Sequence, residues 1–277
     1  MRRQLVAAAA ALCCAAIPVR AETILDMWDF ADAAKSERRF RDALAGASGD
    51  WRLELETQLA RTYSLRQRFA EAHRLLDDVE PRLADAGLKP RLRYLLERGR
   101  TFNSAGEKAR ARPLFLQAWE LGRAGGEEDL AIDAAHMVAI VEAGENALAW
   151  NDKALAMAEK ARDPAARRWQ ASVLNNMGVA LNDLGRHEEA LRYFQRALVA
   201  YQERGDARTI RIARWMVAHT LRLLGRNAQA LDMQLALQQE LSAAGEDDPY
   251  VREELALLYA ALGERAKARD VATPARR

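Results

Sequence analysis

The chain has 277 residues, half of them hydrophobic and 30% charged, with 42 basic against 40 acidic side chains. This near balance provides no basic excess of the kind that indicates nucleic acid as a partner. Alanine, leucine, glutamate and arginine dominate, all strong helix formers, and no run of alternating β-branched residues predicts a strand. The composition therefore favours an all-α fold.

Residues 1–21 predict a signal peptide that lies outside the fold. A basic start precedes an apolar run over residues 5–17, which is short for a membrane span and rich in alanine. Small residues then stand where a signal peptidase reads, so we expect cleavage after Ala21, with Glu22 as the new first residue. The expected location is the periplasm or cell envelope, or outside the cell.

Cleavage changes both the charge and the cysteine content. It leaves 39 basic against 40 acidic side chains, a net charge of −1. It also removes Cys13 and Cys14, so the mature chain would hold no disulfide, thiol nucleophile or cysteine-ligated metal. Two alternatives stay open: an uncleaved leader that acts as an anchor, and lipidation at a cysteine. We expect no stable membrane span after cleavage.

The mature chain is predicted to begin with a helix that packs on the helices after it. Apolar residues recur from Ile24 to Leu44, and a cluster of small and polar residues over 46–50 ends the pattern. We expect one helix from Thr23 to Ala45 within an N-terminal region of residues 22–50.

Two later stretches, 92–118 and 171–197, carry the same pattern at the same spacing. Each has two apolar stripes at helical spacing, separated by a break such as Gly185. Small residues lie where the two helices approach each other, and a phenylalanine fills the space beside them. Because neither helix buries its apolar face within one pair, the pair needs copies stacked beside it. The shared positions are Gly99, Phe102, Ala111, Phe115 and Ala118 in the first stretch, and Gly178, Leu181, Ala190, Phe194 and Ala197 in the second.

When the copies are numbered from their starts, these residues stand at positions 8, 11, 20, 24 and 27. The pattern resembles the tetratricopeptide repeat, a pair of antiparallel helices. Six copies are predicted over residues 51–271, starting near 53, 92, 128, 171, 211 and 249, with a tail over 272–277. Their spacing exceeds the usual period of about 34 residues, so they resemble the longer variants of the family. The resemblance implies an all-α, right-handed α-solenoid.

The last copy is cut short, because its second helix can run only from about residue 264 to 271. We expect Leu255, Leu257, Leu258 and Leu262 to be left partly exposed. The short helix covers them, or this edge docks a partner or a second copy of the chain.

No residue pattern predicts catalysis or metal binding. The four histidines fall in four different copies, none with the spacing that puts two ligands on one helix face. No phosphate-binding loop or nucleophile elbow is present. We therefore expect no enzyme, no metal and no cofactor.

The resemblance implies that the first helices of the copies line a concave groove, through positions 2, 5, 9 and 12. Arginine and asparagine donors there could hold the backbone or carboxylates of a peptide, and a tryptophan could anchor it. The alternatives are arginines that are solvated or ion-paired within the protein, and a tryptophan that packs between repeats. The family's carboxylate-binding set of lysine, asparagine and arginine is not matched. The candidate groove residues are Arg61, Arg93, Arg100, Asn103, Asn175, Asn182, Trp215, His219 and Arg222.

The sequence therefore predicts a non-enzymatic, exported scaffold that binds peptide segments or partner proteins in its groove, and not nucleic acid. Two alternatives remain: a structural oligomer that self-associates through the truncated C-terminal edge, and a sensor subunit for a small ligand or peptide.

Overall fold

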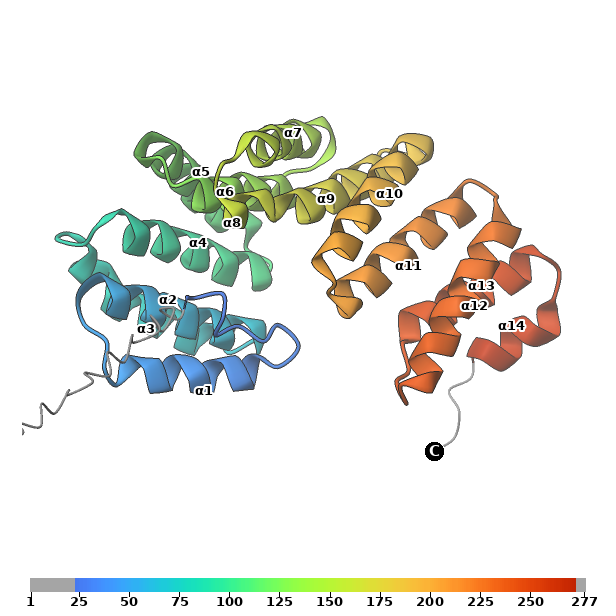
Figure 1. Ribbon diagram of the computed structural model, residues 1–277, viewed down its shortest axis with the longest axis horizontal. Coiled ribbons are helices and arrows are strands. Elements are labelled where there is room, and N and C mark those ends of the chain that lie inside the picture. Colours follow the sequence, from blue (N-terminus) through green and yellow to red (C-terminus); the bar gives the residue numbers. More distant parts are fainter. Residues whose placement is uncertain (1–22, 273–277) are drawn as a thin grey trace, which may run out of the picture.

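The structure, a computed structural model, describes residues 23–272 and shows an arch of helices joined by short turns (Figure 1). The predicted all-α solenoid of tandem helix pairs is confirmed, and no strand occurs within this range. The expected signal peptide, residues 1–21, and the tail residues 273–277 lie outside the described residues.

Six antiparallel helix pairs follow one another along the arch. The pairs are α2 (Gly49–Leu65) with α3 (Phe69–Val79), α4 (Leu88–Ser104) with α5 (Lys108–Gly125), α6 (Glu128–Val141) with α7 (Gly144–Lys160), α9 (Trp169–Asp183) with α10 (His187–Arg204), α11 (Ala207–Leu223) with α12 (Asn227–Ala243), and α13 (Pro249–Ala261) with α14 (Arg265–Ala272). Helix α1 (Ala33–Leu44) precedes them, and the short elements η1 (Glu80–Leu83) and α8 (Pro164–Arg167) lie in connections. The expected starts at 53, 92, 128, 171, 211 and 249 fall within the first helix of each pair.

In the last three pairs, the turn between the two helices depends on glycine. Gly185 and Gly225 both have φ of +73°, and Gly263 has φ of +81°. Only glycine adopts this left-handed conformation without steric cost, and it ends the first helix. The next residue then bonds back to that helix, as Arg186 N does to the Leu181 carbonyl at 2.9 Å.

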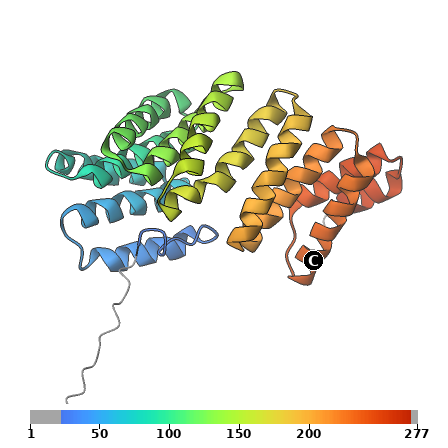
Figure 2. The same ribbon diagram turned by 45° about the horizontal axis from the view of Figure 1, so that its top comes forward.

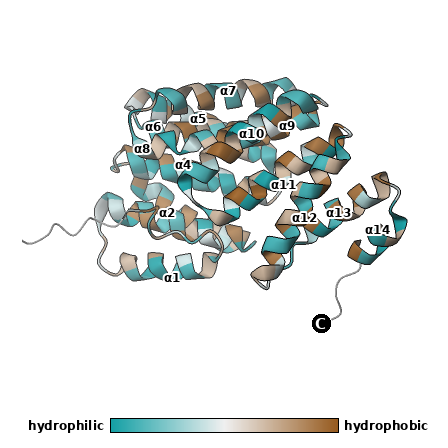
Figure 3. Ribbon diagram, turned by 45° about the vertical axis from the view of Figure 1, so that its right-hand side comes forward, coloured by the Kyte–Doolittle hydropathy of each residue, from teal (hydrophilic) through white to brown (hydrophobic). Residues whose placement is uncertain are grey.

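Glycine also sets how closely two helices of a pair approach. A Cβ atom on Gly178 would lie 2.6 Å from the Phe194 ring, and one on Gly99 would lie 2.5 Å from the Phe115 ring. Both phenylalanine side chains are fully buried. All ten residues with which the sequence defines the repeats are buried in the structure. Figure 3 shows hydrophobic and hydrophilic residues interleaved along each helix, as expected for helices that bury one face.

The N-terminal region differs from the prediction of one helix over residues 23–45. Only α1 is helical, because the Asp32 side chain caps it by accepting from Lys35 N. Residues 23–32 form a chain of turns, which we call the N-terminal strap. Trp28 in the strap is buried against Phe40 of α1, with ring centroids 5.2 Å apart. The strap thus covers the first pair in place of a regular helix.

Within the described residues, which end at Ala272, the C-terminal edge has no comparable cover. Leu257 and Leu262 are 44% and 41% exposed, whereas Leu255 and Leu258 are fully buried, so the expectation of exposure was wrong for these two. They are buried because they face the core clusters formed with α11 and α12, not the open side of α13. No residue of α14 is buried.

Candidate functional site: the inner face of the arch

The first helices of the six pairs form the inner side of the arch. In Figure 1, α5 and α7 lie on its outer side, and α6 and α9 lie beneath them; Figure 2 shows the same arch with its top turned forward. We use "inner face" for the side of α2, α4, α6, α9, α11 and α13 that carries positions 6 and 9 of each repeat. These positions are one helical turn apart and therefore share a face.

Side chains on the inner face join consecutive repeats in a regular way. Position 9 of one repeat contacts position 6 of the next, through residues 33 to 40 positions apart. We call this row of contacts the polar ladder. It occupies side chains that would otherwise be free to bind a ligand.

At the N-terminal end the polar ladder is charged and buried. Arg61 Nη1 lies 3.6 Å from Glu97 Oε1, and Arg100 Nη1 donates to the same oxygen at 2.7 Å. Arg100 also pairs with Asp133. Burial, and then the charge of Arg100, lower the pKa of Arg61. The positive charges on this part of the face are thus neutralised within the protein, as is that of Arg93, whose Nε lies 2.7 Å from Glu54 Oε2.

The N-terminal strap lies against this charged part. Trp28 Nε1 donates to Gln58 Oε1 at 3.0 Å, and the Trp28 ring stacks on Phe30 with centroids 5.0 Å apart. The Arg61 guanidinium lies 5.1 Å from the Trp28 ring and 5.5 Å from the Phe30 ring. Two of the predicted donors, Arg61 and Arg100, are therefore engaged in packing the repeats together.

In the middle of the arch the ladder becomes neutral. Asn176 Nδ2 donates to His136 Nδ1 at 3.2 Å. Burial lowers the pKa of His136 to about 4, so the imidazole is neutral near pH 7. Its ring lies 5.3 Å from that of Trp169, whose Nε1 donates to Asp129 Oδ1 at 2.7 Å.

Between α9 and α11 the ladder is interrupted. Position 9 of α9 is Val179 and position 6 of α11 is Met216, so no polar contact forms there. Val179 is 37% exposed, and Ile212, one turn before Met216, is 47% exposed. The Oδ1 atom of Asn175, on the same side of α9, has no hydrogen-bond partner. This stretch is thus apolar and partly open.

Towards the C-terminus three predicted residues meet around one carboxylate. His219 Nδ1 donates to Glu254 Oε1 at 2.7 Å, and Arg222 Nε donates to Glu254 Oε2 at 2.7 Å. Although burial alone would raise it, the hydrogen bonds from Arg222 and His219 lower the pKa of Glu254 to about 2. Trp215 stacks on His219, with centroids 4.9 Å apart, and contacts Tyr250, which is 66% exposed.

The predicted asparagines have different environments. Asn182 Nδ2 donates to Thr220 Oγ1 at 2.9 Å, which ties α9 to α11. Asn103 is partly exposed at the end of α4. Asn175 keeps an unpaired amide oxygen. The structure thus brings Trp215, His219 and Arg222 together and disperses the other candidates along the face.

Sequence reasoning missed the carboxylates at position 6, because the resemblance directs attention to positions 2, 5, 9 and 12. A signal was available: positions 9 and 6 of consecutive repeats carry complementary polar residues. Among the residues that the structure describes, no group of three histidine, cysteine or acidic side chains could hold a metal ion. In the same part of the chain, no helix is both long and apolar enough to cross a membrane.

The arrangement of helix pairs defines a tetratricopeptide-like solenoid, and comparison with known proteins agrees. The sequence model of the tetratricopeptide repeat family matches residues 133–203 and 169–236, which extend from α6 into α12. No curated protein matches the chain.

Solved structures of this fold are similar at low sequence identity. The Pyrococcus horikoshii protein PH0952, a signal transduction ATPase with numerous domains and a tetratricopeptide repeat sensor, has a TM-score of 0.65 at 15% identity over 86% of this chain. A Rap protein complexed with competence and sporulation factor has a TM-score of 0.61 at 14% identity, covering 86% of this chain and 70% of the Rap chain. NprR in complex with its cognate peptide NprX gives 0.57 at 17%, covering 90% and 74%. The chain spans 38% of the PH0952 chain.

Proposed function

We propose that this chain is a non-enzymatic binding scaffold that holds a peptide segment, or an extended part of a partner protein, on its inner face. The observation that carries the proposal is the alignment of six consecutive first helices, which form one continuous face along the arch. A face of this kind suits an extended segment better than a compact small molecule. The structure of NprR in complex with its cognate peptide NprX supports the same class of ligand.

The test is selection from a displayed library of random peptides against the purified full chain, followed by hydrogen exchange with a selected peptide bound. We expect the peptide to slow exchange in α4, α6, α9 and α11 more than in α5, α7, α10 and α12. Slower exchange confined to the outer helices, or a library that yields no binder, would contradict the proposal.

We further propose that the protein is exported, on the basis of the sequence of residues 1–21. N-terminal sequencing of the protein recovered from the cell envelope of its host tests this. The expected first residue is Glu22, and an intact Met1 would contradict export by cleavage.

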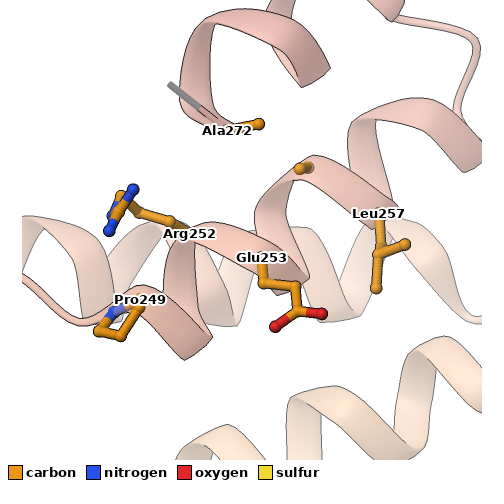
Figure 4. Close-up of a pocket in the computed structure, with 6 residues that line it drawn as sticks. Pro249, Arg252, Glu253, Leu257 and Ala272 are labelled. Atoms are coloured by element: carbon orange, nitrogen blue, oxygen red, sulfur yellow. The ribbon is translucent and has the colours of Figure 1, made fainter. Parts of the chain in front are cut away.

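Self-association is a second candidate function, favoured by the open C-terminal edge. A pocket of about 350 Å³ lies between α13 and α14, lined by Pro249, Arg252, Glu253, Ala256, Leu257 and Ala272 (Figure 4). If two copies meet there, sedimentation will show a dimer that Leu257→Glu disrupts. The same change at Leu235 of α12, which is 37% exposed, is the matched control and should leave the dimer intact. A monomer at all concentrations would exclude this candidate.

A further inference from the structure

The interruption of the polar ladder coincides with two aligned rows of side chains. On α9, Arg168, Ser172, Asn175 and Val179 follow one another at intervals of three and four residues, and therefore share one side of the helix. On α11, Arg208, Ile212 and Met216 do the same. We call the apolar part of these rows the central window: Val179 and Ile212, which are exposed, and Met216, which is half-buried.

Each row begins with an arginine at the N-terminal end of its helix. Arg168 is the N-cap residue of α9, and Arg208 lies in the first turn of α11. Arg204, at the end of α10, donates to the Arg168 carbonyl at 3.3 Å. Partial burial, and then the charge of Arg168, lower the pKa of Arg204, and these effects outweigh the opposing influence of Tyr201 and Asp206. Positive charge therefore accumulates at this end of the window, where the two helix dipoles also favour an anion.

These three arginines differ from those of the polar ladder in forming no ion pair with a carboxylate, although the charge of Asp206 acts on Arg204. Within residues 23–272 none of them forms an ion pair with a carboxylate, whereas Arg61, Arg93, Arg100 and Arg222 all do. Arg208 Nη1 donates at 3.4 Å to the backbone carbonyl of Phe30 in the strap, which is a neutral acceptor. The nearby Asp206 accepts from the Arg208 backbone N at 3.1 Å and so serves to cap α11.

We propose that the central window binds an apolar side chain of an extended peptide, and that an acidic residue of the same peptide lies at the end formed by Arg168, Arg204 and Arg208. This inference rests on the proposed function and specifies the class of peptide.

Helix geometry fixes the spacing between the two groups. Four residues of α11 separate Arg208 from Ile212, about 6 Å, and eleven residues of α9 separate Arg168 from Val179, about 16 Å. An extended peptide covers about 3.3 Å per residue. The acidic residue should therefore stand about two to five positions from the apolar residue.

The experiment uses the peptides selected from the random library, synthesised with a fluorophore and titrated with the purified full chain. We expect their sequences to share an apolar residue with Asp or Glu at that spacing. Val179→Asp should weaken binding at least tenfold. Arg168→Glu with Arg208→Glu should weaken it similarly, and a peptide with Lys in place of the acid should regain affinity for that double variant.

The matched control is Val199→Asp on the outer face of α10, where the valine is 55% exposed, and it should bind like the unchanged chain. The inference would be overturned if the selected peptides shared no apolar residue, or if Val179→Asp bound them as tightly as the unchanged chain does. The proposed function would still stand in that case if the peptides slowed hydrogen exchange on the inner face. A library without binders would overturn both. If the variant with Arg168→Glu and Arg208→Glu bound the acidic peptide with full affinity, the acidic residue would be removed from the proposal.

Discussion

The helix pairs α9–α10 and α11–α12 have the same architecture but differ in how they fill the space between their helices. In α9–α10, Gly178 at position 8 faces the fully buried ring of Phe194 at position 24. In α11–α12, position 8 is Ala218 and position 24 is Gln234, which is fully buried with neither amide atom hydrogen-bonded. Pair α4–α5 follows the first scheme, with Gly99 and Phe115.

The same alternation extends to α6–α7. There Ala135 stands at position 8, and Asn151 at position 24 is buried with an unpaired Oδ1. Glycine thus accompanies an aromatic ring, and alanine accompanies a smaller or polar side chain, because a methyl group and a ring cannot share the space. The pairs with a buried, unpaired amide lose stability relative to those with a ring.

The largest effect is expected on removing the ring from the tighter pair. Phe194→Ala deletes a fully buried ring and should lower the free energy of unfolding by about 3–5 kcal/mol, measured by urea denaturation. Val199→Ala on the same helix alters a side chain that is 55% exposed, and should change stability by less than about 0.5 kcal/mol. Similar losses in the two variants would show that the ring does not hold the pair together.

The second prediction tests the fit between glycine and the ring. Gly178→Ala places a Cβ 2.6 Å from Phe194 and should destabilise by about 1–3 kcal/mol despite the better helix propensity of alanine. Gly46→Ala, where no atom lies within 4 Å of the new Cβ, is the control and should be close to neutral.

A double-mutant cycle sharpens this point. In the presence of Gly178→Ala, the further change Phe194→Leu should recover part of the lost stability, because leucine leaves room for the methyl group. Additive losses would mean that the two positions do not share one space.

The third prediction repairs the weaker pair. Gln234→Leu replaces an unpaired buried amide with an apolar group of similar size and should stabilise the chain by about 1–2 kcal/mol. Gln239→Leu on the exposed side of the same helix is the matched control, for which we expect no gain. Destabilisation by Gln234→Leu would indicate that the amide has a partner in solution.

These pairs also indicate what a sequence can predict of such a fold. Gly178, Phe194 and the turn at Gly185 lie within one repeat, so their spacing alone places them in contact. The polar ladder depends instead on contacts between repeats, whose lengths vary, and residues such as Glu97 were therefore not recognised as partners of Arg61 and Arg100. The N-terminal strap was missed because its apolar residues, including Trp28, match a helical pattern although Asp32 begins the helix later.

An effect of similar size, but one that depends on pH, is expected on the inner face, where position 9 is His136 in α6 and Val179 in α9. The folded pKa of His136 is about 4, below the ordinary value of about 6.5, so the unfolded chain binds the proton more readily between these values. Stability from the neutral imidazole is therefore present above about pH 6.5 and is lost as the pH falls towards 4. We expect a loss on the order of 1–2 kcal/mol from this residue, since its partial exposure reduces the full effect.

Urea denaturation of the unchanged chain and of His136→Asn, at pH 7 and at about pH 4.5, measures this loss of stability. The variant should show the shallower pH dependence. A direct check is the NMR titration of the His136 ring, and a midpoint near 6.5 would mean that the Asn176 contact opens in solution and that this rung of the ladder is available to a ligand.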